Sequence, residues 1–252
     1  MAVTTVRALL RRLVPGRFWA WREQRLVARI RARNRGRSTR EIFSEIYATA
    51  QWGGKRGEFN SGRGSQASVT GAYCAMIREF IEAHQISSVV DLGCGDFEVG
   101  KRIQCPGVSY VGVDVVPALI EHNRRLFGSA TVQFECLDIV DDALPRAELC
   151  LVRQVFQHLS NQQIAAVLVK LDQFTHVIVT EHYPANPEAC VPNLDKPAGA
   201  DTRLYDGSGV FLNQPPFDRE VRLLLSSELP AATRSGETLR SLLLGPALDH
   251  GK

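Results

Sequence analysis

The sequence predicts an α/β fold: a mostly parallel sheet of seven strands, closed by an antiparallel strand, with helices on both faces and a helical extension at the N-terminus. Three observations predict it. Between residues 88 and 180, short apolar runs alternate with segments of helical periodicity, as is typical of a parallel sheet. Two later apolar runs lie too close together for a crossover helix, so we expect them to pair antiparallel. The 252 residues, 44% of them hydrophobic, suffice for the core of one such domain.

Residues 1–38 are interpreted as a basic amphipathic N-terminal extension. The first forty residues contain twelve arginines and one acid, whereas the remainder holds 18 basic and 26 acidic residues. Apolar residues recur at helical spacing within 3–13 and again in Phe18–Arg33, where two tryptophans stand among arginines. Such helices suit an anionic membrane surface, which we expect residues 1–38 to bind. A solvated extension packed on the body and a mitochondrial transit peptide are the open alternatives.

Residues 39–84 are predicted to form a helical segment that covers the ligand site. Helices are expected at 39–51 and 69–84, and the residues between them are rich in glycine. We expect Trp52 or Arg63 of this glycine-rich loop to close over the site. An ordinary solvated linker is the alternative.

Residues 85–252 are predicted to form the ligand-binding domain. Its five parallel strands are expected at Ser88–Leu92, Tyr110–Asp114, Val132–Cys136, Leu149–Val152 and His176–Thr180. Helical stretches are expected near 98–104, 117–126 and 161–173. The antiparallel pair that completes the sheet is expected at Glu220–Leu225 and Thr238–Leu244.

A glycine turn follows the first strand, in the segment Val89-Val-Asp-Leu-Gly-Cys-Gly-Asp-Phe-Glu-Val-Gly100. Glycines at this turn let the backbone approach a ligand closely, and Asp114 ends the next strand, where an acid accepts hydrogen bonds from ribose hydroxyls. An NAD site shares both features. The Gly-x-Gly-x-x-x-x-Gly spacing differs from the dinucleotide pattern, however, and Asp96 would repel a pyrophosphate while suiting a cationic ligand.

Four segments in order resemble the motifs of class I S-adenosylmethionine (SAM)-dependent methyltransferases, which have a Rossmann-like fold. They are Asp91-Leu-Gly-Cys-Gly-Asp96, Val113-Asp114, Cys136-Leu-Asp138-Ile139 and Arg153-Gln-Val-Phe-Gln-His158-Leu. The resemblance spans roughly residues 85–182. It implies SAM as the cofactor and a methyltransferase activity.

The resemblance also implies the role of each cofactor-binding residue. The first-motif residues Asp91, Gly93 and Gly95 would hold the methionine portion, and Asp114 the ribose. Asp138 would reach the adenine amine, with Ile139 stacking beside the ring. We also assign Asp96, Val115 and Arg153 to the cofactor site. Asp138 could instead cap a turn, since aspartate is favoured there.

Candidate catalytic residues follow the fourth and fifth strands. His182 is the preferred general base for a hydroxyl acceptor, and Glu181 could orient an imidazole or a substrate hydroxyl. His158 is the second candidate base, although a histidine at this place also packs or caps the next helix. The long irregular stretch 183–217 is predicted to be an acceptor loop, because loops of this length usually build a binding site or a lid.

The leading functional hypothesis is O-methylation of a hydroxylated acceptor, such as a cell-surface glycan or a lipid-linked sugar. A small-molecule or nucleic-acid methyltransferase, a non-catalytic SAM-binding adaptor and an NAD-dependent oxidoreductase are the alternatives. An acidic body and the lack of an Asn/Asp-Pro-Pro-Tyr motif argue against nucleic acid as a partner. The six scattered cysteines lack zinc-ligand spacing, so we expect no metal and a reduced, cytoplasmic protein. The basic extension would hold this protein peripherally at the inner membrane face.

Overall fold

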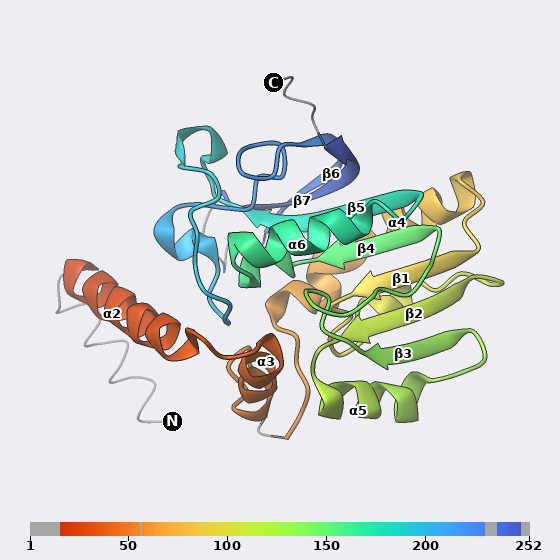
Figure 1. Ribbon diagram of the computed structural model, residues 1–252, viewed down its shortest axis with the longest axis horizontal. Coiled ribbons are helices and arrows are strands. Elements are labelled where there is room, and N and C mark those ends of the chain that lie inside the picture. Colours follow the sequence, from red (N-terminus) through yellow and green to blue (C-terminus); the bar gives the residue numbers. More distant parts are fainter. Residues whose placement is uncertain (1–15, 56, 230–235, 248–252) are drawn as a thin grey trace.

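The computed structural model describes residues 16–55, 57–229 and 236–247. They contain a seven-stranded sheet with the strand order β3-β2-β1-β4-β5-β7-β6 (Figure 1). Its strands are β1 (Ser88–Leu92), β2 (Ser109–Asp114), β3 (Val132–Cys136), β4 (Leu149–Arg153), β5 (His176–Tyr183), β6 (Arg219–Glu228) and β7 (Thr238–Ala247). The neighbouring strands among β1 to β5 pair parallel, whereas β7 pairs antiparallel with both β5 and β6. The predicted fold class is therefore confirmed.

The helices are α2 (Gly16–Asn34), α3 (Thr39–Ala48), α4 (Ala67–Ala83), α5 (Pro117–Phe127) and α6 (Asn161–Leu171). α6 packs on one face of the sheet, where Ile164 and Val167 join Val90 and Val152 in one core cluster. α4 and α5 cover the opposite face, on which Ile77 and Ile120 belong to a second cluster. Burial on both faces explains why β1 and β4 read as continuous apolar runs in the sequence.

Two helices begin at a capping box, in which a serine hydroxyl accepts from the third helical N–H and that residue's side chain accepts from the serine N–H. Ser38 and Glu41 form the box of α3, and Ser160 and Gln163 form that of α6. α3 consequently starts where predicted, one residue after its cap.

The predicted helix at 98–104 is wrong. The structure has only one turn of 3-10 helix there, η2 (Gly100–Arg102). Phe97 adopts a positive φ of 63° and its ring is 3% exposed. Phe97 directly precedes the segment, and burial of its ring in the core compensates for the strain. Gly100, within the segment, disfavours an α-helix by about 1 kcal/mol relative to alanine.

β5 is longer than predicted, since it continues to Tyr183 instead of ending at Thr180. The extension pairs with β7, with Glu181 opposite Arg240 and His182 opposite Leu239. Glu181 and His182 therefore lie within a strand and not in the loop after it. A local sequence pattern does not reveal this, because the extension depends on pairing with a distant strand.

The predicted helix Phe18–Arg33 lies within α2, while the pattern over 3–13 lies outside the described residues. α2 docks on the segment 198–206 through two side chains: Asn34 Nδ2 donates to the Ala198 carbonyl at 3.0 Å, and Arg31 pairs with Asp201 and Asp206. Within the described residues, no helix combines the length and the apolar character needed to cross a membrane.

Candidate functional site

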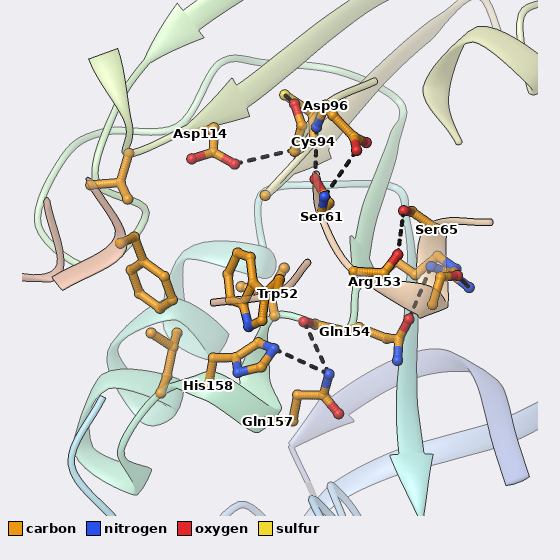
Figure 2. A pocket seen from close by; sticks show the side chains of 18 of the residues that line it. Trp52, Ser61, Ser65, Cys94, Asp96, Asp114, Arg153, Gln154, Gln157 and His158 are labelled. Carbon is orange, nitrogen blue, oxygen red and sulfur yellow. Dashed lines mark hydrogen bonds between the residues drawn. The ribbon is translucent and has the colours of Figure 1, made fainter. Parts of the chain in front are cut away.

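A cavity of about 290 Å³ opens at the carboxyl ends of the parallel strands, between the sheet and the segment formed by α3 and the glycine-rich loop (Figure 2). The sheet side contributes the residues after β1, β2, β3 and β4. The covering side contributes three aromatic residues and a run of five loop residues, namely Phe43, Tyr47, Trp52 and Ser61 to Ser65. The glycine-rich loop is thus part of the cavity wall, contrary to its reading as a solvated linker.

All nine residues that the sequence assigned to the cofactor line this cavity: Asp91, Gly93, Gly95, Asp96, Asp114, Val115, Asp138, Ile139 and Arg153. The backbone of the glycine turn lies so close to neighbouring side chains that there is no room for a Cβ, as expected from the sequence. Gly93 and Gly95 have positive φ values of 79° and 56°, and a Cβ on either would collide with Val155 or Ser61. Sequence motifs separated by up to 62 residues therefore converge on one wall.

Two buried carboxylates mark the centre of the cavity. Asp114 accepts from the backbone N–H of Gly95 at 3.2 Å and of Val116 at 3.1 Å, while Asp91 accepts from the Tyr110 hydroxyl at 2.5 Å. Burial raises the pKa of Asp114 and that of Asp91 to about 6, although the hydrogen bonds pull in the opposite direction. Both groups are still mainly ionised at neutral pH, so they suit hydroxyl donors or a cation.

Asp138 both lines the cavity and caps a turn. Its Oδ1 accepts from the Val140 N–H at 3.0 Å, and its Oδ2 accepts from the hydroxyl of Thr39 at the start of α3. Lys170 of α6 fixes the same turn by donating to the carbonyls of Ile139 and Val140. The Asp138 carboxylate therefore caps the turn and at the same time faces the cavity, where the sequence assigned it to the ligand. Thr39 of α3 contacts this carboxylate from the covering side of the cavity.

Asp96 joins the glycine turn to the covering loop. The Ser61 N–H donates to Asp96 Oδ2 at 2.9 Å, and the Asp96 N–H donates to Ser61 Oγ at 2.8 Å. Tyr47 of α3 contacts the same hydroxyl at 2.9 Å. These reciprocal bonds hold the loop directly over the turn.

Arg153 makes a second link between the sheet and the loop. It donates to the Gly64 carbonyl at 2.8 Å and to Gln154 Oε1 at 3.1 Å, and its guanidinium lies 5.0 Å from the centre of the Tyr73 ring. Its Nε is buried and has no hydrogen-bond partner among the described residues. That donor is available to a ligand in the cavity.

Glu181 and His182 do not line the cavity. The buried Glu181 carboxylate accepts from the N–H groups of Val155, Phe156 and Gln157, at 2.9 to 3.2 Å, and so fixes the turn after β4. Burial raises its pKa to about 8. His182 Nε2 lies 3.1 Å from Glu237 Oε2, on the β7 side of β5. Glu181 and His182 lie in the part of β5 that pairs with β7, which explains why both are away from the cavity. Neither side chain is placed to contact a ligand there.

His158 is the histidine that lines the cavity. Its Nδ1–H donates to the Gly199 carbonyl at 3.1 Å, and Gln157 Nε2 lies 3.3 Å from its Nε2 as the matching donor. The contact with Gln157 favours the neutral ring, because only an unprotonated Nε2 can accept, whereas the bond to the Gly199 carbonyl favours the charged ring less strongly than burial opposes it. Burial, reinforced by the charge of Lys196, lowers the pKa of His158 to about 3.

Sequence reasoning missed most of the aromatic wall. Phe43 and Tyr47 lie one helical turn apart on α3, and Trp52 packs against both, with ring centres 6.0 and 5.2 Å away. The Trp52 ring also lies 5.2 Å from His158, and its Nε1 is 3.5 Å from the Ala200 carbonyl across the cavity mouth. The spacing of Phe43 and Tyr47 was the available signal for this wall.

Gln154 was also missed. It adopts a positive φ of 55°, and Figure 2 shows its side chain beside Arg153 at the end of β4. A strained non-glycine residue at a cavity wall is typical of functional sites.

Comparison with solved structures identifies the class I methyltransferase fold. Human N-acetylserotonin methyltransferase in complex with SAM matches with a TM-score of 0.54 and 14% sequence identity, over 93% of this chain and 68% of that one. The N-methyltransferase NodS from Bradyrhizobium japonicum, in complex with S-adenosyl-L-homocysteine (SAH), matches with a TM-score of 0.50 and 13% identity, over 72% of this chain and 89% of that one. No protein-family model and no curated protein matches the sequence. The fold implied by the sequence motifs is therefore confirmed.

Proposed function

We propose that the chain binds SAM in this cavity and transfers its methyl group to a hydroxylated acceptor. The observation that carries the proposal is the convergence of the nine sequence-assigned residues on one cavity. The neighbouring strands β3, β2 and β1 carry these residues in the order that the proposal assigns to the ligand: Asp138 for adenine, Asp114 for ribose, and Asp91 with the glycine turn for methionine. Two solved structures with a similar fold, N-acetylserotonin methyltransferase and NodS, contain SAM and SAH.

The charge of the cavity supports SAM over a dinucleotide. Asp91, Asp96 and Asp114 all line the end beside the glycine turn. Three carboxylates attract an ammonium and a sulfonium and repel a pyrophosphate. An NAD-dependent activity is therefore the weaker alternative.

Methyl transfer is an in-line displacement: a bond forms from the acceptor oxygen to the methyl carbon, the carbon–sulfur bond breaks, and the acceptor proton must leave. We place the proton acceptor at His158, because its imidazole lines the cavity and its unprotonated Nε2, beside the Gln157 amide, can take a proton. His182, with Glu181 to orient it, is the alternative base and would require a movement of the end of β5.

A transfer assay tests the activity and the base together. Methyl-labelled SAM is incubated with the protein and with separated glycan, lipid-linked sugar, nucleic-acid and small-molecule fractions of the source cell. We expect label in a glycan or lipid-linked fraction, and its loss in His158→Gln. Loss in His182→Gln alone would favour the alternative base.

Label confined to nucleic acid or small molecules would contradict the proposed acceptor. SAH binding without label in any fraction would instead favour a non-catalytic adaptor.

We further propose that α2 attaches the protein peripherally to an anionic membrane surface at the cytoplasmic face, where lipid-linked acceptors are accessible. Arg31 and Asn34 face the body of the protein, whereas Arg25, Leu26 and Arg29 on the same helix are exposed. Leu26 is 58% exposed. An exposed apolar residue between arginines is typical of helices that lie in a membrane interface.

Vesicle sedimentation measures this attachment. Replacing Arg25 and Arg29 by serine should weaken partition onto phosphatidylglycerol-containing vesicles roughly 30-fold, at about 1 kcal/mol per basic residue. Phosphatidylcholine vesicles should bind neither protein. Arg125 and Arg222, which are exposed on the body, provide the matched double-serine control. Equal loss in the control, or no preference for the anionic lipid, would contradict the proposal.

A further inference from the structure

Glu181 is a buried carboxylate that the proposed reaction does not use directly. It lies on β5, is 2% exposed and does not line the cavity. Taking a carboxylate out of water costs free energy unless hydrogen bonds replace the water that it loses. The groups that donate to Glu181 therefore indicate what this residue does.

Three consecutive N–H groups of the turn after β4 donate to Glu181. Oε1 accepts from Val155 at 3.1 Å and from Phe156 at 2.9 Å, and Oε2 accepts from Gln157 at 3.2 Å. Gln154, directly before these residues, has a positive φ of 55°. A strained backbone of this kind persists only when its surroundings hold it. The carboxylate thus fixes three successive peptide groups of a strained turn.

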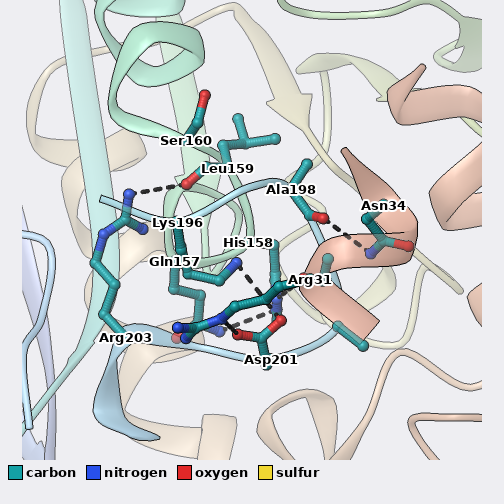
Figure 3. A network of polar contacts seen from close by, with 12 residues as sticks. Arg31, Asn34, Gln157, His158, Leu159, Ser160, Lys196, Ala198, Asp201 and Arg203 are labelled. Atoms are coloured by element: carbon teal, nitrogen blue, oxygen red, sulfur yellow. Dashed lines mark hydrogen bonds and ion pairs between the residues drawn. The ribbon is translucent and has the colours of Figure 1, made fainter. Parts of the chain in front are cut away.

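A second buried charge, the guanidinium of Arg203, holds the same turn. It donates to the carbonyls of Phe156 at 3.1 Å and of Leu159 at 2.8 Å, and Figure 3 shows Arg203 beside this turn. Burial raises the pKa of Glu181, and the hydrogen bonds from the turn, together with the charge of Arg203, oppose that rise. The turn is therefore bonded to a carboxylate through its N–H groups and to a guanidinium through its carbonyls.

The turn that Glu181 holds carries the proposed base. Gln154, Gln157 and His158 all line the cavity. The Gln157 amide lies 3.3 Å from His158 Nε2, as Figure 2 shows, and the backbone N–H of His158 donates to the Val155 carbonyl at 2.9 Å. A shift of the Gln157 peptide would consequently move both the imidazole and the amide beside it.

We propose that Glu181 is a positioning residue for methyl transfer, which sets the place of Gln157 and His158 by accepting from the three N–H groups of their turn. This inference rests on the proposed function and deepens it, since it explains how the base is held. Glu181 itself contacts neither the imidazole nor the cavity. Position matters for the rate, because a misplacement of about 1 Å can cost roughly 100-fold.

Glu181→Gln tests the proposal, because glutamine keeps the shape and removes one acceptor. Its carbonyl oxygen can still accept from Val155 and Phe156, whereas its NH2 group then meets the Gln157 N–H, donor against donor. The bond nearest to the base is lost. We expect the rate of transfer at saturating SAM to fall about 10- to 100-fold, as for the loss of one hydrogen bond to a charged group. The KM for SAM and the affinity for SAH should change by less than about twofold.

Thr180→Val is the matched control. Thr180 precedes Glu181 on β5, is 2% exposed, and donates from its hydroxyl to Ser241 Oγ at 2.9 Å. Valine removes this buried hydrogen bond and touches none of the side-chain contacts of the turn. We expect the melting temperature to fall in both variants and the rate to fall only in Glu181→Gln, so that lost stability does not explain the difference.

Nitrogen NMR of the histidine rings provides a readout that needs no acceptor. The full chain is loaded with SAH, and the ring signals of His158 are identified by their loss in His158→Gln. We expect these signals to shift in Glu181→Gln and to stay in place in Thr180→Val. A role confined to stability would leave them unchanged in the folded protein.

Glu181→Asp carries the test if the glutamine variant does not fold. Aspartate keeps the negative charge and sets its oxygens back from the turn by one methylene. We expect the same fall in rate at an unchanged KM for SAM, because the position of the oxygens holds the turn. A rate equal to that of the wild type would show that only the charge matters, and would overturn the proposal.

Four results with Glu181→Gln also overturn it. They are a rate equal to that of the wild type, a loss of SAH affinity as large as the loss of rate, an equal loss of rate in Thr180→Val, and unchanged His158 signals. A wild type that binds SAH and transfers no label would instead contradict the proposed function. The His158 signals still decide in that case whether Glu181 positions the ring, so the two failures are distinguishable.

Discussion

Replacing Arg203 by methionine should lower the free energy of unfolding by about 3–5 kcal/mol, as expected when one partner of a buried charged network is removed. Arg203 is 1% exposed and donates four hydrogen bonds, to the carbonyls of Leu194, Phe156 and Leu159 and to Asn161 Oδ1, at 2.7 to 3.1 Å. Methionine would fill much of the volume but leave these acceptors without a donor in a buried place. The guanidinium thus ties the acceptor loop to the turn after β4.

Urea unfolding followed by circular dichroism measures this loss. Arg125→Met is the control, because Arg125 is exposed on α5 and such substitutions usually change stability by less than about 0.5 kcal/mol. A loss below about 1 kcal/mol for Arg203→Met would mean that water replaces the guanidinium and that the loop is not held by these bonds.

Replacing Asp114 by alanine should weaken SAH binding at least 100-fold, since it removes the two charge-assisted hydrogen bonds that we propose to the ribose, each of about 1.5–3 kcal/mol. The backbone N–H groups of Gly95 and Val116 lose their acceptor as well, and the glycine turn becomes less well ordered. Isothermal titration calorimetry at pH 7.5 gives the affinity. Glu121→Ala on the exposed face of α5 is the control, and an equal loss there would contradict the assignment.

The same residue predicts a pH dependence of binding. The pKa of Asp114 is raised to about 6 in the free protein, so the carboxylate that we propose as the acceptor of the ribose hydroxyls is lost as the pH falls below 6. Binding must then expel a proton, and affinity falls by up to about tenfold per pH unit. Asp91 titrates in the same window, so the contribution of Asp114 is the part of the slope that Asp114→Ala abolishes. An identical slope in both proteins would contradict it.

The cofactor end of the cavity could be predicted from the sequence because its determinants are local. An apolar run buried on both faces, such as β1, predicts a parallel strand, and the glycines of the next turn reveal a close backbone approach. Parallel strands bring their carboxyl ends to one edge of the sheet, so residues that follow separate strands must lie together. This geometry explains why Asp91, Asp114 and Asp138 line one wall.

Only the tertiary structure decided the acceptor end. Pairing of β5 with β7 carries His182 away from the cavity, and the fold of the loop brings Lys196 behind Gln157 and His158. Docking of α3 supplies the aromatic wall. These positions depend on pairing and packing between residues far apart in the chain, whereas periodicity and turn chemistry report only on neighbours. The sequence by itself therefore determined the fold and the residues that line the cavity beside the glycine turn, and long-range packing determined the side chains that line the rest of it.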